Sequence, residues 1–302
     1  MKNITNISIG IPAYNEGANI KNLLESLLRQ EEAGFHITDI IVISDGSTDN
    51  TVQQAMLVED ERIKVFRDGM RLGKSERLKQ IFTIFKGDVL FLMDADIVIN
   101  DNLLFSKIIK NSDFKRDGLV GVNAIPYPSD KFFENVLECG VLIMKEIAAN
   151  WHKGNNYLSF KGCFLGLDRK FAKSVRIVPG LVNNDAYLYF SAVTKGFTTR
   201  YLSDIKVFYK SPATFSDHLK QSSRYQNSQM ELKHYFHSDL KREYQIPFTL
   251  TFIKTIKYLF LRPIHLLSYI GINILTRLKK EQELISTWNI AVSTKGGSHE
   301  PR

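Results

Sequence analysis

Cysteine is scarce in this chain, and long apolar runs are missing from it. Its 302 residues include only Cys139 and Cys163, with no C-x-x-C pair, which excludes a disulfide framework and a cysteine-rich zinc site. The N-terminal stretch MKNITNISIG lacks the apolar region and cleavage site of a signal peptide. The apolar segments 248–261 and 263–278 are both shorter than the roughly 20 residues that a membrane-spanning helix needs. We therefore expect a protein of the reducing cytoplasm without a spanning helix.

The positive charge gathers in the most apolar part of the chain. The net charge is +8, and residues 241–302 contain ten Lys or Arg and four Glu. Nucleic-acid binders usually spread basic residues over a polar face, so we expect no nucleic-acid partner. Basic residues among Leu, Ile and Phe suit a membrane surface better. We predict amphipathic helices over 237–285, lying peripherally on the cytoplasmic side of a membrane. The alternative is that these helices pack on the body of the protein.

Apolar strand-like and helix-like segments alternate along the first hundred residues, which is typical of parallel βαβ units. The sequence predicts an α/β fold with a mainly parallel sheet flanked by helices. The expected strands cover 7–11, 39–44, 63–66, 88–96, 118–127, 157–169 and 198–209. The expected helices cover 19–30, a segment from 51, 71–87, 130–150, 184–196 and 214–236. We divide the chain into a domain over 1–236, with halves 1–100 and 101–236, the helices over 237–285, and a loose tail over 286–302.

Carboxylates follow a buried strand in FLMDADI. Asp94 and Asp96 end this apolar run, and such a placement costs free energy unless a positive charge meets it. Mg²⁺ and Mn²⁺ favour one or two carboxylates together with phosphate oxygens, although capping of the strand end is the alternative. Asp45 ends an earlier strand, and Lys74 lies in a glycine turn where it could meet a phosphate or simply remain solvated. The carboxyl ends of parallel strands form one crevice, so we expect a nucleotide-diphosphate site there.

Four motifs, IPAYNE, VISDGSTDNT, GMRLGKSERL and LFLMDADI, follow one another in an informative order. Over residues 7 to about 230 the chain resembles the family 2 glycosyltransferases, inverting enzymes with a GT-A-type fold. The resemblance implies that Asp45 and the turn after the first strand hold the nucleotide base and ribose, and that Asp96, assisted by Asp94, binds Mn²⁺ or Mg²⁺ on the diphosphate. The residues of that turn are Pro12, Ala13, Tyr14, Asn15 and Glu16. Where many relatives carry two adjacent acids, this chain has Ser44 and then Asp45.

The second half of the chain extends the resemblance. VNNDAYLYF is similar to the Glu-Asp site of the family, with Asn184 in place of Glu and Asp185 retained, which implies that Asp185 is the general base; a helix N-cap is the alternative. KQSSRYQNS resembles the Gln-x-x-Arg-Trp motif of membrane-associated synthases, and Arg224 would neutralise the departing diphosphate. Gln221 and Tyr225 complete this motif. An acceptor-site turn is implied at Gly162 and Cys163.

These features predict a metal-dependent inverting transferase. It would move a hexosyl or N-acetylhexosaminyl group from a nucleotide-diphospho-sugar, with UDP as the expected nucleotide, to a hydroxyl of a lipid-linked or saccharide acceptor. A nucleotidyltransferase is a weaker alternative, because it would need a glycine-rich basic loop after the first strand, and PAYNEGAN contains one Gly and no Lys or Arg. A non-catalytic sugar-nucleotide or membrane-binding module would be expected to have lost acids such as Asp185, which this chain retains.

Overall fold

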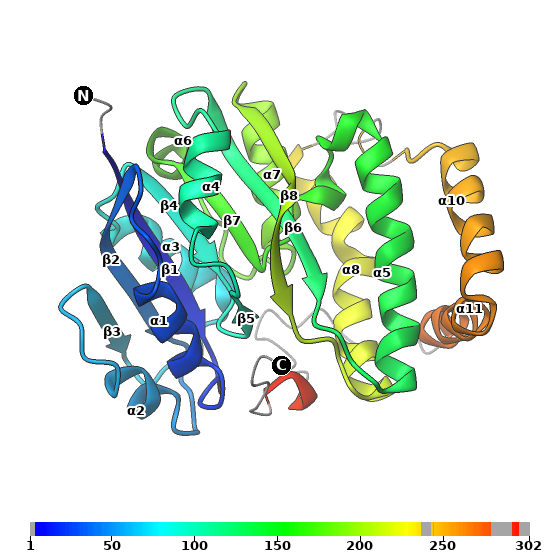
Figure 1. The fold of residues 1–302 in the computed structure, drawn as a ribbon, viewed down its shortest axis with the longest axis horizontal. Helices are drawn as coiled ribbons and strands as arrows, with labels where there is room; N and C mark the ends of the chain where they lie inside the picture. The colour runs from blue at the N-terminus through cyan, green and yellow to red at the C-terminus, as the bar shows by residue number, and fades with distance from the viewer. Residues whose placement is uncertain (1–3, 237–242, 244, 279–291, 296–302) are drawn as a thin grey trace.

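A single eight-stranded sheet organises the chain in the computed structural model (Figure 1), in the order β3-β2-β1-β4-β7-β6-β8-β5. The structure describes residues 4–236, 243, 245–278 and 292–295; the side chains of residues 223–230 and of Val292 lie outside the described part. The strands are β1 (Thr5–Ala13), β2 (Phe35–Ser44), β3 (Ile63–Arg67), β4 (Val89–Met93), β5 (Ile97–Val98), β6 (Asp117–Pro126), β7 (Phe164–Asp168) and β8 (Thr198–Tyr209).

The sheet is mixed, and its first half is parallel as the sequence predicts. Strands β3, β2, β1 and β4 run in one direction, whereas β7 is antiparallel to both β4 and β6. Strand β8 returns parallel to β6 and pairs with the short, antiparallel β5. Because β1, β2 and β4 are parallel, the turns that follow them meet at one edge of the sheet, where ligands of open α/β sheets bind.

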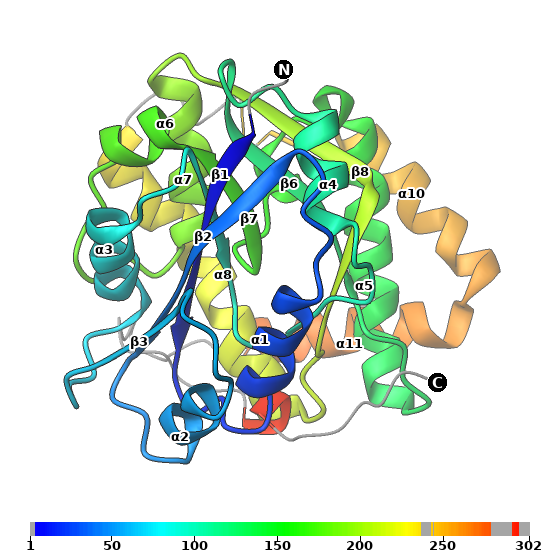
Figure 2. The same cartoon turned by 60° about the vertical axis from the view of Figure 1, so that its left-hand side comes forward.

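Helices cover both faces of the sheet (Figure 2). One core cluster joins the sheet to α1 (Ile20–Leu28), α2 (Thr51–Met56) and α4 (Leu104–Asn111). The other joins it to α3 (Lys74–Ile84), α6 (Arg169–Ser174), α7 (Asn184–Thr194) and α8 (Phe215–Phe236). Gly10 of β1 shows how closely α3 approaches, since a Cβ there would lie 2.5 Å from Cγ2 of Ile81. The core thus holds the strand ends of β1 and β4 in a fixed relation to the first turn of α3.

The two C-terminal helices pack on α5 (Phe132–Asn150) and leave one side uncovered. Helices α10 (Phe248–Leu261) and α11 (Pro263–Leu278) have the predicted bounds and share a core cluster with α5 through Tyr258 and Leu266. Ion pairs of Lys257 with Glu146 and of Arg262 with Glu138 fix this packing. Ten apolar side chains of α10 and α11 are nevertheless more than half exposed: Phe248, Phe252, Ile253, Phe260, Leu261, Ile264, Leu267, Ile274, Leu275 and Leu278. Within the described ranges, no helix is both long and apolar enough to cross a membrane.

The prediction of a loose tail is wrong for one short segment. The 3₁₀ helix η4 (Val292–Lys295) lies against α1 and the beginning of α8 (Figure 2). Hydrogen bonds rather than an apolar stripe hold it, so hydrophobic periodicity gives no sign of it. Trp288 and Ile290, the large apolar residues of the predicted tail, lie outside the described residues.

Candidate active site

The turn after β1 and the turn after β2 are joined by hydrogen bonds. The backbone N–H of Asn15 donates to Oγ of Ser47 over 3.1 Å, and the N–H of Glu16 donates to Oγ1 of Thr51 over 2.7 Å. Asn15 has a φ of 52°, a left-handed conformation that Asn tolerates better than most residues. These hydrogen bonds therefore hold the predicted nucleotide turn in a defined conformation at this edge of the sheet.

Tyr14 of this turn has a cationic neighbour that the sequence did not indicate. Pro12, Ala13 and Tyr14 are all buried, and the guanidinium carbon of Arg71 lies 3.7 Å from the centroid of the Tyr14 ring. A cation over an aromatic face is attracted by the ring quadrupole. Arg71 thus connects the turn after β1 with the loop before α3.

Asp45 reaches the same edge but faces inward. It accepts hydrogen bonds from the backbone N–H groups of Leu72 at 2.8 Å and Gly73 at 3.1 Å, and from Nε of Arg77 at 2.8 Å. Arg77 is only 1% exposed and also pairs with Asp68, which lowers the pKa of Asp68 to about 2. This geometry favours a supporting role for Asp45, because the carboxylate holds the glycine turn that presents Lys74.

A continuous path of contacts links the end of β4 to the beginning of α7. The ammonium of Lys74 pairs with Asp94 and donates to the carbonyl of Gly162 at 3.3 Å. The backbone N–H of Gly162 donates to Oδ2 of Asp185 at 3.0 Å. Asp94 also donates its N–H to the carbonyl of Cys163 at 3.0 Å. The expected cation acids and the expected base therefore share one site rather than remote surfaces.

Three carboxylates gather beside this path around one lysine. The ammonium of Lys295 pairs with Glu16, and Asp96 and Asp94 face it as well. Burial raises the pKa of Glu16 to about 7, and Asp96 adds to that rise while Lys295 and Asn19 oppose it. Burial also raises the pKa of Asp96. The attraction of Lys295 lowers this pKa, and the negative charge of Asp94 raises it further. The pKa of Lys295 rises because the attraction of Glu16 and Asp96 outweighs the effect of burial.

This acidic cluster fits a divalent cation that also needs phosphate ligands. In the part of the chain that the structure describes, no group of three His, Cys, Asp or Glu is arranged to hold a metal by itself. Mg²⁺ and Mn²⁺ usually take one or two carboxylates, water and substrate phosphates, and Asp94 and Asp96 provide such a pair on one turn. The ammonium of Lys295, paired with Glu16, is a positive charge that acts on both of these acids. The oxygen donors of this pair are of the kind that Mn²⁺ and Mg²⁺ take, and the metal itself stays a prediction.

The remaining predicted residues lie around Asp185. Asn184 is buried, and its Nδ2 donates to the carbonyl of Leu181 at 3.2 Å. Burial raises the pKa of the Cys163 thiol to about 12, which suits a wall of the site rather than a nucleophile. Gln221 is half-buried on α8. Arg224 and Tyr225 follow on the same helix, and their side chains lie outside the described residues.

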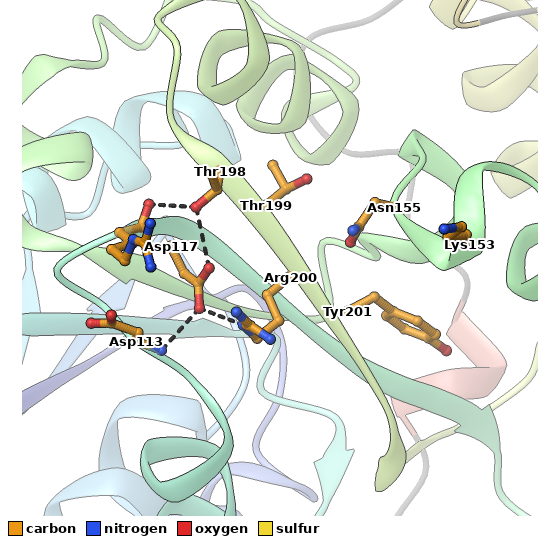
Figure 3. A pocket seen from close by; sticks show the side chains of 9 residues that line it. Asp113, Asp117, Lys153, Asn155, Thr198, Thr199, Arg200 and Tyr201 are labelled. Carbon is orange, nitrogen blue, oxygen red and sulfur yellow. Dashed lines mark hydrogen bonds and ion pairs between the residues drawn. The ribbon is translucent and has the colours of Figure 1, made fainter.

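A hollow of about 320 Å³ lies elsewhere, at the beginnings of β6 and β8 (Figure 3). Asp117 in its wall pairs with Arg200 and accepts hydrogen bonds from Thr198 Oγ1 at 3.2 Å and from the N–H of Asp113 at 2.9 Å. These contacts satisfy the carboxylate internally. The hollow contains none of the residues of the strand-end site, so we assign the candidate active site to the sheet edge instead.

Comparison with known families agrees with this geometry. The sequence model described as "Glycosyl transferase family 2" matches residues 8–175, more than half of the chain. The chain belongs to glycosyl transferase family 2. The matched range contains the turn after β1, the acids after β4 and the Gly162 turn, and it ends before Asp185.

Two curated relatives cover parts of this family 2 chain. The "Putative glycosyltransferase CsbB" of Bacillus subtilis is 27% identical over 189 residues, which are 54% of this chain and 56% of that protein. The "Undecaprenyl-phosphate 4-deoxy-4-formamido-L-arabinose transferase" of Proteus mirabilis is 27% identical over 97 residues, which are 31% of this chain and 30% of that protein. The chain thus spans between about a third and about half of the length of these relatives.

Solved structures share the GT-A-type fold of this family 2 chain. The "Mannosyltransferase PcManGT from Pyrobaculum calidifontis in complex with GDP-Man and Mn2+" has a TM-score of 0.58 at 16% identity, covering 93% of this chain and 78% of that one. A glucosyl-3-phosphoglycerate synthase from Mycobacterium tuberculosis, in complex with Mn²⁺, UDP and phosphoglyceric acid, has a TM-score of 0.54 at 17% identity, covering 76% and 78%. At these identities the likeness establishes the fold alone.

Several residues of the site escape sequence reasoning. Arg77 lies within the matched GMRLGKSERL motif, but only the structure shows that it is buried against Asp45. Lys210 donates to Oδ1 of Asn19 over 2.7 Å at the rim of the acidic cluster. Lys295 comes from a segment without a motif or a period. Such contacts between distant segments have no local sequence signal.

Proposed function

We propose that this family 2 chain is a metal-dependent inverting glycosyltransferase. It moves a sugar from a nucleotide-diphospho-sugar to a hydroxyl of a lipid-linked or saccharide acceptor at the cytoplasmic face of a membrane. UDP is the first nucleotide to consider, and the sugar is a hexose or an N-acetylhexosamine. The observation that supports this proposal most is the unbroken path from Asp45 through Lys74, Asp94 and Gly162 to Asp185.

The donor would lie over the strand ends. In this proposal the turn of residues 12–16, with Tyr14 at its centre, receives the base and ribose, and Asp45 holds the neighbouring glycine turn in place. Asp96 and Asp94 would hold a Mn²⁺ or Mg²⁺ ion, which supplies charge neutralisation for the diphosphate when it is bound. Lys74 lies next to the acids, so its ammonium can turn from Asp94 towards a phosphate oxygen.

Transfer would occur between the end of β4 and the beginning of α7. Asp185 takes the proton of the acceptor hydroxyl while that oxygen bonds to the anomeric carbon, and the bond from that carbon to the diphosphate breaks on the opposite face. The N–H of Gly162 orients the Asp185 carboxylate. Arg224, on the helix that also carries Gln221 and Tyr225, would balance the charge of the leaving diphosphate.

A group of lysines favours an anionic acceptor. Lys145 of α5, Lys161 and Lys206 of β8 face one another, and burial together with the other two ammonium groups lowers the pKa of Lys145 to about 8. Among the described residues, none of the three has a carboxylate within ion-pair distance. Lys161 also precedes Gly162, so this positive group adjoins the proposed base. A phosphate of a lipid-linked acceptor would relieve the repulsion between these lysines.

The exposed apolar side of α10 and α11 supports contact with a membrane. One side of these helices packs on α5, and the other presents large side chains such as Phe260 at 82% and Ile264 at 66% exposure. Exposed apolar side chains of this kind on a basic segment suit insertion into the headgroup region. Because α5 also carries Lys145, the patch and the lysine group belong to neighbouring parts of one structural unit.

The decisive experiment is a screen of nucleotide-sugars with Mn²⁺ and Mg²⁺, followed by a transfer assay with polyprenyl-phosphate and saccharide acceptors. A donor that binds only the folded state raises the melting temperature in proportion to the logarithm of its concentration. We expect metal-dependent stabilisation by UDP-sugars, with GDP-sugars as the comparison, and release of the nucleoside diphosphate on transfer. Binding without turnover under all acceptor conditions would favour the non-catalytic module. No binding of any nucleotide-sugar would reject the proposal.

A further inference from the structure

The segment η4 is attached to the protein body by contacts that do not involve the acidic cluster. The N–H of Ser293 donates to Oδ2 of Asp217 at 3.0 Å, and the N–H of Ala213 donates to Oγ of Ser293 at 2.9 Å. The carbonyl of Thr294 accepts a bond from Nδ2 of Asn19 at 3.4 Å. The backbone of this segment is thus docked between α1 and the beginning of α8, whatever its last side chain contacts.

The side chain of Lys295 extends from this docked backbone into the site. Its side chain is only 17% exposed, and its ammonium pairs with Glu16 beside Asp96. Asp96 is the residue for which we propose cation binding, and Glu16 belongs to the turn that we assign to the nucleotide. The ammonium of Lys295 therefore lies beside the proposed cation site and pairs with a residue of the nucleotide turn.

We propose that Lys295 is a donor-site residue with two successive partners: it pairs with Glu16, beside Asp96, while the site contains no donor, and it contacts the diphosphate once a divalent cation and the donor have entered. The first half follows from the observed ion pair. The second follows from the docked backbone, which would keep the ammonium beside the site when a cation and the donor are bound. This inference rests on the proposed function, because it uses the cation and the diphosphate assigned there.

The two halves predict opposite effects of one substitution. Without nucleotide, the ammonium of Lys295 repels a divalent cation at the neighbouring Asp94 and Asp96, so Lys295→Met should bind Mn²⁺ about 10-fold more tightly than the wild type. With saturating Mn²⁺, the same variant lacks a charge on the diphosphate and should bind UDP about 10-fold more weakly. Uridine should bind both proteins equally, because it has no phosphate. A merely structural defect would weaken all ligands together.

The test measures free Mn²⁺ by electron paramagnetic resonance and UDP and uridine binding by calorimetry, with the full chain. Lys295→Arg keeps the charge and should resemble the wild type in both assays. Lys107→Met is the matched control: Lys107 of α4 is exposed and pairs with Asp101, so its removal should change the Mn²⁺ affinity by less than about 3-fold because solvent screens its charge.

Each result has a definite meaning. Tighter Mn²⁺ and weaker UDP binding in Lys295→Met alone supports the inference. Unchanged or weaker Mn²⁺ binding, unchanged UDP binding, or an equal gain in Lys107→Met overturns it and leaves the proposed function standing. A wild-type protein that binds neither Mn²⁺ nor any nucleoside diphosphate overturns the inference and the proposed function together.

Discussion

Replacing Asp185 by Asn separates chemistry from binding at the proposed base. Both carboxylate oxygens accept backbone hydrogen bonds, Oδ2 from Gly162 at 3.0 Å and Oδ1 from Ala186 at 2.9 Å. An amide has one acceptor atom, so Asp185→Asn must turn its NH₂ group towards one of these N–H donors. Two buried donors that face each other without an acceptor cost about 1–3 kcal/mol of folding free energy. The variant should therefore be slightly less stable than the wild type, yet folded.

The effect on turnover should be much larger than this loss of stability. A positioned general base contributes about 10²–10⁴-fold to a rate, which corresponds to roughly 3–5 kcal/mol of activation free energy. Asp185 is separated from the acidic cluster by Gly162 and Lys74, so we expect the donor affinity of Asp185→Asn to stay within about 3-fold of the wild-type value.

The control variant is Asp168→Ala. Asp168 caps α6 by accepting bonds from the N–H groups of Lys170 and Phe171, and its loss should cost about 0.5–2 kcal/mol at the opposite end of the sheet from the site. Steady-state transfer and calorimetric donor binding would be measured for both variants under conditions where each is fully folded. If Asp185→Asn keeps more than about a tenth of the wild-type kcat, or if Asp168→Ala loses as much, the base lies elsewhere.

Three further predictions concern the cation, the membrane and pH. Asp96→Ala should weaken Mn²⁺-dependent nucleotide binding by about 10-fold or more, because it removes a charged oxygen ligand; the loop variant Asp60→Ala, which breaks an ion pair with Arg62, is the control, and equal affinities would refute the assignment. The double variant Phe260→Glu/Ile264→Glu should release the protein from anionic liposomes, since burying each apolar side chain is worth about 1.5–3 kcal/mol; Phe66→Glu on β3 should have no effect, and co-sedimentation like that of the wild type would show that the patch does not bind lipid. The pKa of Lys145 is lowered to about 8, so the unfolded chain binds more protons than the folded one between about pH 8 and the normal Lys value near 10.4. The wild-type free energy of unfolding should therefore rise by about 1 kcal/mol or more between pH 7.5 and pH 9.5. Denaturant titrations of Lys145→Met should lack this rise. If the two proteins show the same dependence on pH, the neighbouring lysines do not lower the pKa of Lys145.

The sequence predicts those elements whose signals are local. Apolar runs that end in Asp or Asn predict β1, β2 and β4, and the helix bounds of α10 and α11 agree with the apolar segments around Pro263. The reversal of β7 between β4 and β6 is not predictable in this way, because an apolar strand buried on both faces has the same pattern in either direction. Helix α4 and the short β5 also went unpredicted.

The site shows the same division between local and distant information. Motif order places Asp94, Asp96 and Asp185 on one edge, and the contacts through Lys74 and Gly162 connect them. The basic partners of the acidic residues in the site are not predictable from motif order. Arg77 buries the charge of Asp45, and Lys295 meets Glu16 from a segment 279 positions further along the chain. Only the folded chain shows which charges are already satisfied.

This difference changes how the candidate site is understood. The sequence predicts a group of acids that bind a cation, with Lys74 and Arg224 as the basic residues of the site. In the fold, Lys74 pairs with Asp94 and Lys295 pairs with Glu16, while Asp96 stays beside both ammonium groups with a raised pKa. A divalent ion must therefore displace internal partners before it can bind, and the diphosphate that follows gives those ammonium groups new anions to contact. Binding of the cation and of the donor should consequently be coupled, since each makes the rearrangement required by the other less costly.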